Sequence, residues 1–408
     1  MQMPTTTEET LDRGRRERER SEYPEGFPVL PPVPAGRYVD ETFAALERTA
    51  VFERSWLFVA HADELPEPGD YVLLRQLHRP VLLVRGTDGT IRAFLDSCQH
   101  RGASVVPEDS GNTGRRLVCG YHAWTYDLEG TLVGLPGAQD FQVDTGCLGL
   151  PKVRCEQWGS LVFVNLDPDA PPLLPALGAV GRELHDQIGG GDRVGPIHLV
   201  ARRSIEVDGN WKLTVDANIE TYHVNTVHRR SAARVLDQSA TGIFLLPDGH
   251  SRMLVHSRDD AAFPIDLPTF PGASPLADCG IYSFHLFPNT SIVFGGSPAL
   301  AFLISSWPTA PDRSLYDVHF LAATPADGPH RELVELLVDA NWGVLLEDLG
   351  NLAAIQRSLS TGGLSGLHLS YQERRIYHQH EELDRRIGAD HVPAALRVEP
   401  VLGGWIEE

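Results

Sequence analysis

The sequence predicts an α+β protein in two parts, and three observations support this prediction. Residues 56–168 consist of short strand-like runs joined by tight turns, whereas residues 169–408 mix longer strands with a few long helices. A proline-rich junction, "PDAPPLLP" at 168–175, lies between these two textures. The chain has 408 residues, which is enough for two domains that each bury a core.

The N-terminal segment divides into an arm and a helix. Residues 1–37 are charged and then proline-rich, a composition that predicts a disordered or extended arm. Residues 38–55 carry apolar side chains at near-helical spacing, and Asp40 or Thr42 can cap a helix there. We expect this helix to pack on the C-terminal domain.

The first domain, residues 56–168, is predicted to be β-rich. "PVLLVR", "TDGT" and "IRAFLD" follow one another as strand, tight turn and strand, and Asp88 with Gly89 forms the hairpin signal. "TYDLEGTL" and "GSLVFVNLD" repeat the pattern further along. In the second domain, residues 169–408, the stretch 331–359 is the clearest helical one.

Charge and cysteine content restrict the function. The formal net charge of −20 disfavours nucleic-acid binding, which relies on clustered Lys and Arg. Five scattered cysteines do not resemble a disulfide framework, so any ordered spacing among them favours a metal site. The charged N-terminus lacks an apolar signal-peptide core, and no run of 18 apolar residues predicts a membrane span. We therefore expect a cytoplasmic protein.

The first candidate metal site lies in two short loops of the β-rich domain. Cys98 and His100 form a C-x-H pair, and Cys119 and His122 form a C-x2-H pair after eighteen further residues. Two such loops, each offering one thiolate and one imidazole, can bind a metal between the tips of two β-hairpins. The spacing alone leaves two possibilities open: a zinc ion, and a 2Fe–2S cluster with two cysteine and two histidine ligands.

The second candidate site lies in "GNWKLTVDANIETYHVNTVH", residues 209–228. His223 and His228 are five residues apart, which on an ideal helix separates them by about 140°. If both bind one metal, the helix must therefore break, widen or end between them. The intervening valine, asparagine and threonine are poor helix formers and permit this.

Together these motifs resemble those of the large (alpha) subunit of Rieske non-haem iron aromatic-ring-hydroxylating oxygenases. "CQHRG" and "CGYHAWTYDLEGTL" match the two Rieske loops, and N-W-K followed by acid-x-Y-H and a second histidine matches the mononuclear-iron motif. The resemblance implies an N-terminal Rieske β-sandwich and a helix-grip-like catalytic domain with a curved antiparallel sheet and helices. It also implies that the cysteines bind one iron of the cluster and the histidines bind the other.

The resemblance implies that Asp348 completes a facial triad with the two histidines, because "EDLGNLAAIQ" resembles the family's E-D-x7-Q element. Asp348 also lies on an apolar 3-4-3 stripe with Leu345, Leu352 and Ile355. A carboxylate directed into a core needs a counter-charge, which Fe(II) would provide. Glu347 falls off this stripe, so we expect it to face solvent.

Two further residues acquire roles from the resemblance. Glu220 matches the family's bridging acid, which contacts His223 and, across a subunit boundary, His122 of a neighbouring subunit. Tyr222 is expected to pack nearby or to donate a hydrogen bond. The chain departs from the common pattern at Asp216 with Ala217 and at Ala353, and the first departure lies where it can alter substrate orientation.

The implied function is that of a terminal oxygenase. Electrons come from NAD(P)H through a separate reductase or ferredoxin. The enzyme uses O2 to dihydroxylate or monooxygenate a small hydrophobic substrate, which we expect to contain an aromatic ring. The implied assembly is a homotrimer, or an α3β3 complex with a small subunit. Two alternatives remain open: demethylation of a non-aromatic amine or ether, and a zinc-stabilised binding protein without catalysis.

Overall fold

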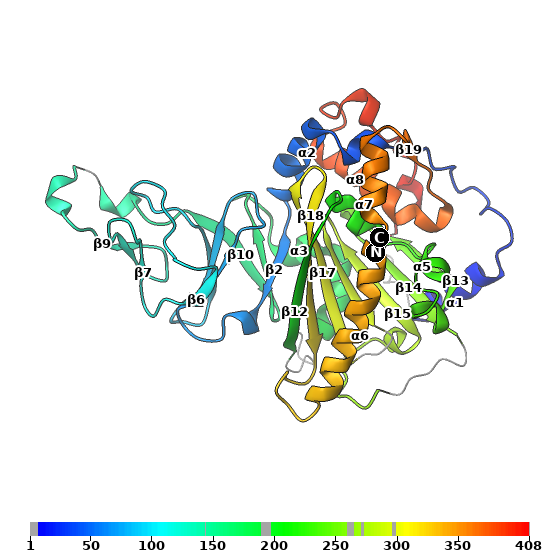
Figure 1. Cartoon of the computed structure of the whole chain (residues 1–408), viewed down its shortest axis with the longest axis horizontal. Helices are drawn as coiled ribbons and strands as arrows, with labels where there is room; N and C mark the ends of the chain where they lie inside the picture. The colour runs from blue at the N-terminus through cyan, green and yellow to red at the C-terminus, as the bar shows by residue number, and fades with distance from the viewer. Residues whose placement is uncertain are drawn as a thin grey trace. The chain divides into compact units, whose positions relative to one another are not determined.

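The computed structural model describes residues 7–142, 144–188, 197–258, 265–270, 273–295 and 299–407. The chain divides into two compact units (Figure 1). One comprises Glu53–Leu173, and the other joins Met1–Phe52 to Leu174–Glu408. The N-terminal residues thus belong to the same unit as the C-terminal part of the chain. No described helix is both long and apolar enough to cross a membrane.

The unit Glu53–Leu173 is built from antiparallel strands. Its larger sheet has seven strands in the order β2-β11-β10-β5-β4-β3-β6, and its smaller sheet has the order β7-β8-β9. The strands of the larger sheet are β2 (Leu57–His61), β3 (Asp70–Leu74), β4 (Val81–Arg85), β5 (Ile91–Leu95), β6 (Ser110–Asn112), β10 (Lys152–Trp158) and β11 (Leu161–Asn165). Those of the smaller sheet are β7 (Leu117–Val118), β8 (Thr125–Tyr126) and β9 (Leu132–Gly134).

The turn residues of this unit act as the sequence predicts. The β4–β5 hairpin turns at Asp88 and Gly89, where Gly89 adopts a φ of 80°, a left-handed conformation that glycine adopts without strain. β10 pairs with β5 at Lys152 and Val153 and then with β11 from Arg154 onward. A strand that changes partners in this way forms a corner of a β-sandwich.

The second unit is organised around one curved antiparallel sheet of seven strands, in the order β12-β18-β17-β16-β15-β14-β13 (Figure 1). The strands are β12 (His198–Val207), β13 (Leu236–Leu245), β14 (Ser251–Ser257), β15 (Gly280–Leu286), β16 (Thr290–Gly295), β17 (Leu300–Ala310) and β18 (Arg313–Ala322). The helices C-terminal to residue 172 are α3 (Leu173–Ile188), α4 (Trp211–Asn218), α5 (Val224–Val227), α6 (Arg331–Leu349), α7 (Leu352–Ser360) and α8 (Arg374–Ile387).

Helices cover both faces of this sheet. On one face, Val338 of α6 and Tyr377 of α8 join the core with sheet residues such as Met253 and Phe302. On the other face, Glu183 of α3 contacts Arg252 of β14, whose side chain points opposite to that of Met253. The first face carries the candidate site described below.

The predicted disordered or extended arm is wrong for part of residues 1–37. Residues Thr7–Glu19 form a helix, α1, that packs against β13 and β14. Gly14 makes a close approach possible, since a Cβ at this position would lie 2.3 Å from the His256 ring. Composition favours disorder here because the arm is highly charged, but those charges pair with the fold, as Arg18 does with Asp237 at 2.9 Å.

The helix predicted within residues 38–55 is present as α2 (Glu41–Glu47), which continues into a wider turn over Arg48–Phe52. Asp40 is its N-cap and accepts a hydrogen bond from the Phe43 backbone N–H at 2.7 Å. Phe43 and Val51 are fully buried, and α2 contacts α8. A short ladder between β1 (Val33–Pro34) and β19 (Gly366–Leu367) fixes the chain before this helix.

Candidate metal centres

His223 and His228 lie at the two ends of α5, a single helical turn. α4 follows its N-cap Asn210 and ends at Asn218, so the helix stops before the first histidine. His223 is then the N-cap and His228 the C-cap of α5. The chain therefore breaks between α4 and this turn, and both imidazoles are directed to the same point. The turn ends at Val227, between the two histidines, as their five-residue spacing requires if they share a metal.

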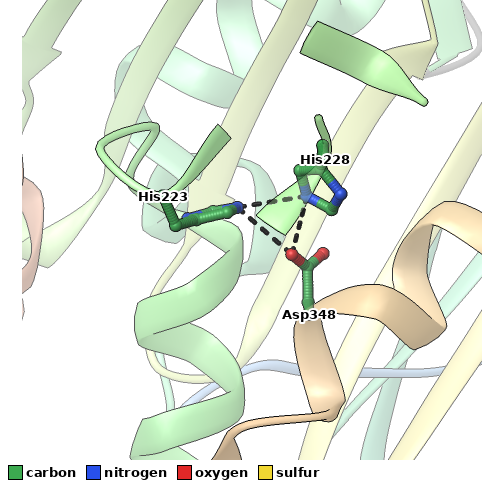
Figure 2. A group of neighbouring side chains, drawn as sticks. All are labelled: His223, His228 and Asp348. Atoms are coloured by element: carbon green, nitrogen blue, oxygen red, sulfur yellow. Dashed lines mark hydrogen bonds and ion pairs between the residues drawn. The ribbon is translucent and has the colours of Figure 1, made fainter. Parts of the chain in front are cut away.

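Asp348, near the end of α6, meets both imidazoles (Figure 2). Its Oδ1 lies 3.1 Å from His223 Nε2 and 2.8 Å from His228 Nε2, and the two nitrogens are 3.2 Å apart. Three ligands on one face of an octahedron, with bonds of about 2.1 Å, lie about 3 Å from one another. The donor set and its spacing therefore fit a divalent metal held by two histidines and one carboxylate.

The electrostatics around these side chains favour a cation. Burial lowers the pKa of His223, but hydrogen bonds with Asp348 and Glu220 outweigh burial and raise it to about 10. Burial raises the pKa of Asp348, and its contacts with the two histidines more than reverse that effect. The carboxylates thus stabilise positive charge at this point, which a bound metal ion would supply in place of protons.

Glu220 and Tyr222 lie on the loop that leads from α4 to α5. The Glu220 carboxylate contacts His223 Nδ1 and also accepts a hydrogen bond from the Tyr222 backbone N–H. This leaves His223 Nε2 directed toward Asp348. The Tyr222 side chain is 63% exposed, so its contact with the site comes through its backbone, whereas its ring faces solvent.

The expectation that Glu347 merely faces solvent is wrong. Its Oε2 accepts hydrogen bonds from His228 Nδ1 at 2.8 Å and from the Ser231 hydroxyl at 2.6 Å, although the side chain remains partly exposed. The apolar-stripe argument assumed one continuous helix, but α6 ends at Leu349 and α7 starts at Leu352. Ile355, the last member of the predicted stripe, is accordingly 38% exposed.

We expect Glu347→Ala to weaken divalent-metal binding at this site by about 10- to 100-fold, because a carboxylate bonded to the outer nitrogen of a ligating histidine fixes its orientation and raises its basicity. The measurement is metal retained during dialysis against chelators of graded affinity. Glu335→Ala is the control, because Glu335 lies on the same helix and forms an exposed ion pair with Arg331, away from the candidate site. Equal retention by both variants would show that Glu347 does not support the site.

The candidate metal centre forms one wall of an apolar pocket. The floor comes from the concave face of the sheet, and α4, α5 and α6 supply the remaining sides. Its apolar lining residues include Val224, Leu236, Met253, Val255, Ile281, Val293, Phe302, Ile304 and Leu345. A small hydrophobic molecule in this pocket would lie beside His223, His228 and Asp348.

The four predicted ligands of the first domain also come together in pairs. Cys98 and Cys119 are both buried, and neither forms a disulfide. The rings of His100 and His122 have centroids 4.5 Å apart. His100 Nδ1 is buried without a hydrogen-bond partner in the part of the chain that the structure describes, as expected for a nitrogen that binds a metal. These donors fit a binuclear cluster.

Trp124 and Tyr126 lie beside this site. Trp124 stacks on the His100 ring at a centroid distance of 5.0 Å. The Tyr126 hydroxyl accepts a hydrogen bond from the Gln99 backbone N–H at 3.0 Å and lies 3.4 Å from Cys98 Sγ. Burial, followed by the contact with Cys98, raises the pKa of Tyr126, so the hydroxyl keeps its proton and can donate a hydrogen bond to the sulfur. Such bonds raise the reduction potential of a cluster.

Two family models match this chain. The Rieske 2Fe–2S domain matches residues 55–152, and the catalytic domain of the ring-hydroxylating alpha subunit matches residues 196–389. The first match covers the paired cysteine and histidine loops, and the second covers His223, His228 and Asp348. The match to the Rieske domain decides between the 2Fe–2S cluster and the zinc ion, which the spacing alone left open.

The relatives of known function include aromatic dioxygenases and a carnitine monooxygenase. The large oxygenase component of the 2,4-dinitrotoluene dioxygenase system of Burkholderia sp. (strain RASC) is 34% identical over 270 residues, which is 64% of this chain and 56% of that component. The match thus spans little more than half of that relative. The carnitine monooxygenase oxygenase subunit of Escherichia coli (strain K12) is 28% identical over 84% of this chain and 89% of its own length.

Solved structures agree with the fold. A quaternary ammonium Rieske monooxygenase superposes with a TM-score of 0.75 at 22% identity, covering 91% of this chain and 100% of the other. Naphthalene 1,2-dioxygenase from Rhodococcus sp. gives a TM-score of 0.71 at 23% identity, covering 95% of this chain and 100% of the other. At these identities the likeness shows the arrangement of a Rieske domain followed by a catalytic domain with a curved sheet.

The family models and the relatives agree with each other and with the geometry of both sites. The chain belongs to the large oxygenase components of the Rieske non-haem iron oxygenases, oxidoreductases whose cofactors are a Rieske 2Fe–2S cluster and a mononuclear iron.

Proposed function

We propose that this protein is the terminal oxygenase of a multicomponent system that hydroxylates a small hydrophobic substrate with O2. The observation that carries the proposal is the convergence of His223, His228 and Asp348 on one wall of an apolar pocket. These three side chains would hold Fe(II), and iron at this position supplies O2 activation at coordination positions that the protein leaves open. The pocket holds the substrate beside it and excludes water.

Electrons would reach this site from the cluster held by Cys98, His100, Cys119 and His122. We infer that a separate ferredoxin or reductase, supplied by NAD(P)H, reduces the cluster. His122 is exposed in its own unit, and Tyr222, next to Glu220, is exposed in the other. This exposure supports a head-to-tail assembly, a homotrimer or α3β3 complex, in which Glu220 of one subunit contacts His122 of the next.

We favour an aromatic or other neutral apolar group at the iron over a quaternary ammonium group. Recognition of quaternary ammonium commonly uses a cage of several aromatic rings. Phe302 is the only aromatic side chain among the described lining residues. The second candidate is oxidative demethylation of a non-aromatic amine or ether, and the match along 84% of this chain to a carnitine monooxygenase subunit favours it.

A substrate screen separates the two candidates. Aromatic compounds and N-methyl or O-methyl compounds are supplied to the reconstituted system, and O2 consumed is compared with product formed. We expect coupled product formation with aromatic compounds. Coupling only with methylated amines or ethers would replace the first candidate by the second, and coupling with neither class would contradict both.

A further inference from the structure

The most unusual charged group of the catalytic unit is Arg375, near the start of α8. Its side chain is 1% exposed, and it lies against the sheet face that lines the pocket. Its Nε donates to the Ser251 hydroxyl at 2.8 Å, and its Nη1 contacts the Ile219 carbonyl at 3.3 Å and Met253 Sδ at 3.5 Å. All three partners are neutral.

No carboxylate forms an ion pair with Arg375 among the residues that the structure describes, and its Nη2 is buried without a hydrogen-bond partner there. Burial, reinforced by the neighbouring Arg374, lowers the pKa of Arg375 to about 9. An unpaired buried charge is among the most costly features that a fold can contain. A bound group of opposite charge would offset this cost.

The polar neighbours of Arg375 are uncharged and buried. Gln379 lies one helical turn further along α8, and its buried side chain contacts the His285 ring. His285, whose strand position pairs with Ser251, has two buried ring nitrogens that face no carboxylate among the described residues. The buried Ser283 hydroxyl has no hydrogen-bond partner in the same part of the chain. All three side chains are at most 2% exposed. Together with Arg375 they form the buried polar cluster of this unit.

This buried polar cluster adjoins the substrate pocket. Ser283 lines the pocket directly, and Met253, which contacts Arg375, lines it too. Met253 and Ser283 are register partners on β14 and β15, so they are neighbours on the same sheet face. Ser283 is thus a member of both the pocket wall and the cluster. Met253 is flexible and unbranched, so its movement can open the wall between them.

We propose that the natural substrate is an organic acid, with an apolar body near the iron and a carboxylate that reaches Arg375. This inference rests on the proposed function and specifies its substrate class. A guanidinium binds a carboxylate through two parallel hydrogen bonds, for which Nη2 is available. Ser283, Gln379 and neutral His285 are uncharged donors that can complete the binding of one negative charge. A dianion such as a phosphate would meet Arg375 as the single cation of this buried polar cluster.

The test compares each acid with its own amide, because the two have nearly the same shape and differ in charge. Benzoate, phenylacetate and 3-phenylpropionate and their amides are titrated calorimetrically into the anaerobic protein. We expect at least one acid to bind about tenfold or more tightly than its amide, the effect of a hydrogen bond to a charged group. If no acid in the series binds better than its amide, the proposal is wrong.

Arg375→Met should abolish this preference, whereas Arg374→Met should retain it. Arg374 is the matched control, because it is the adjacent buried arginine and instead lies over the Tyr371 ring. Arg375→Met should also unfold at the same or a higher temperature than the wild type, since the charge that it removes is unpaired. A large fall in that temperature, or a retained preference for the acid, would overturn the proposal.

Iron and sulfide are measured on the same samples. Their absence would contradict the proposed oxygenase function, whereas normal metal content with no preference for acids would contradict only the substrate class.

Discussion

Asp348→Ala is expected to abolish oxygenation. The substitution removes the one carboxylate oxygen that lies within 3.1 Å of both His223 Nε2 and His228 Nε2. Two histidines alone form a weak site for Fe(II), which prefers two histidines and a carboxylate. We expect the mononuclear iron to be lost and substrate turnover to fall below detection. The cluster in the other unit should remain, so the visible spectrum of the protein should be unchanged.

Asp339→Ala is the control for this prediction. Asp339 lies on the same helix, α6, but its carboxylate is largely exposed and pairs with Arg203 at the surface. This variant should bind iron and turn over like the wild type. Retention of iron and of coupled turnover by Asp348→Ala would show that the metal is held elsewhere.

Glu220→Gln is expected to slow the transfer of electrons from the cluster to the mononuclear site by about 10- to 100-fold while both metals remain bound. The amide can still accept a hydrogen bond from His223, so the imidazole should keep its orientation. It cannot supply the negative charge that stabilises the histidine and, in the proposed assembly, His122 of the next subunit. The measurement is the rate at which the pre-reduced cluster is reoxidised when substrate and O2 are added.

This reoxidation rate distinguishes an electron-transfer role from a structural one. A residue that only stabilises the fold would lower iron content and leave the rate per bound iron unchanged. Glu335→Gln, at the exposed end of an ion pair with Arg331, should match the wild type in both measurements. Loss of iron from Glu220→Gln with normal reoxidation in the remaining sites would contradict the proposed bridge.

Much of the fold was accessible from local sequence signals. The β4–β5 hairpin is dictated by the pair Asp88 and Gly89, and the N-cap of α2 by Asp40. The candidate metal ligands could also be proposed from the sequence, because cysteine and histidine at short, ordered spacing are rare and chemically specific. The five-residue spacing of His223 and His228 correctly indicated that no continuous helix carries both.

What the sequence did not reveal depends on contacts between distant segments. The composition of α1 favours disorder, and only its packing on β13 and its ion pairs with the fold stabilise the helix. Helical periodicity predicted that Glu347 faces solvent. Periodicity alone cannot show that α6 ends at Leu349 or that His228 lies beside Glu347. The sequence around Arg375 is strongly charged, so it did not indicate that this side chain is buried.

The central claim is that one chain carries both a Rieske cluster and a mononuclear iron. Its most direct test is the iron and acid-labile sulfide content of the purified protein, combined with electron paramagnetic resonance after reduction. We predict about three iron atoms and two sulfides per chain, and the resonance of a reduced 2Fe–2S cluster with two histidine ligands. A colourless protein that contains zinc alone, with no sulfide and no such resonance, would contradict it.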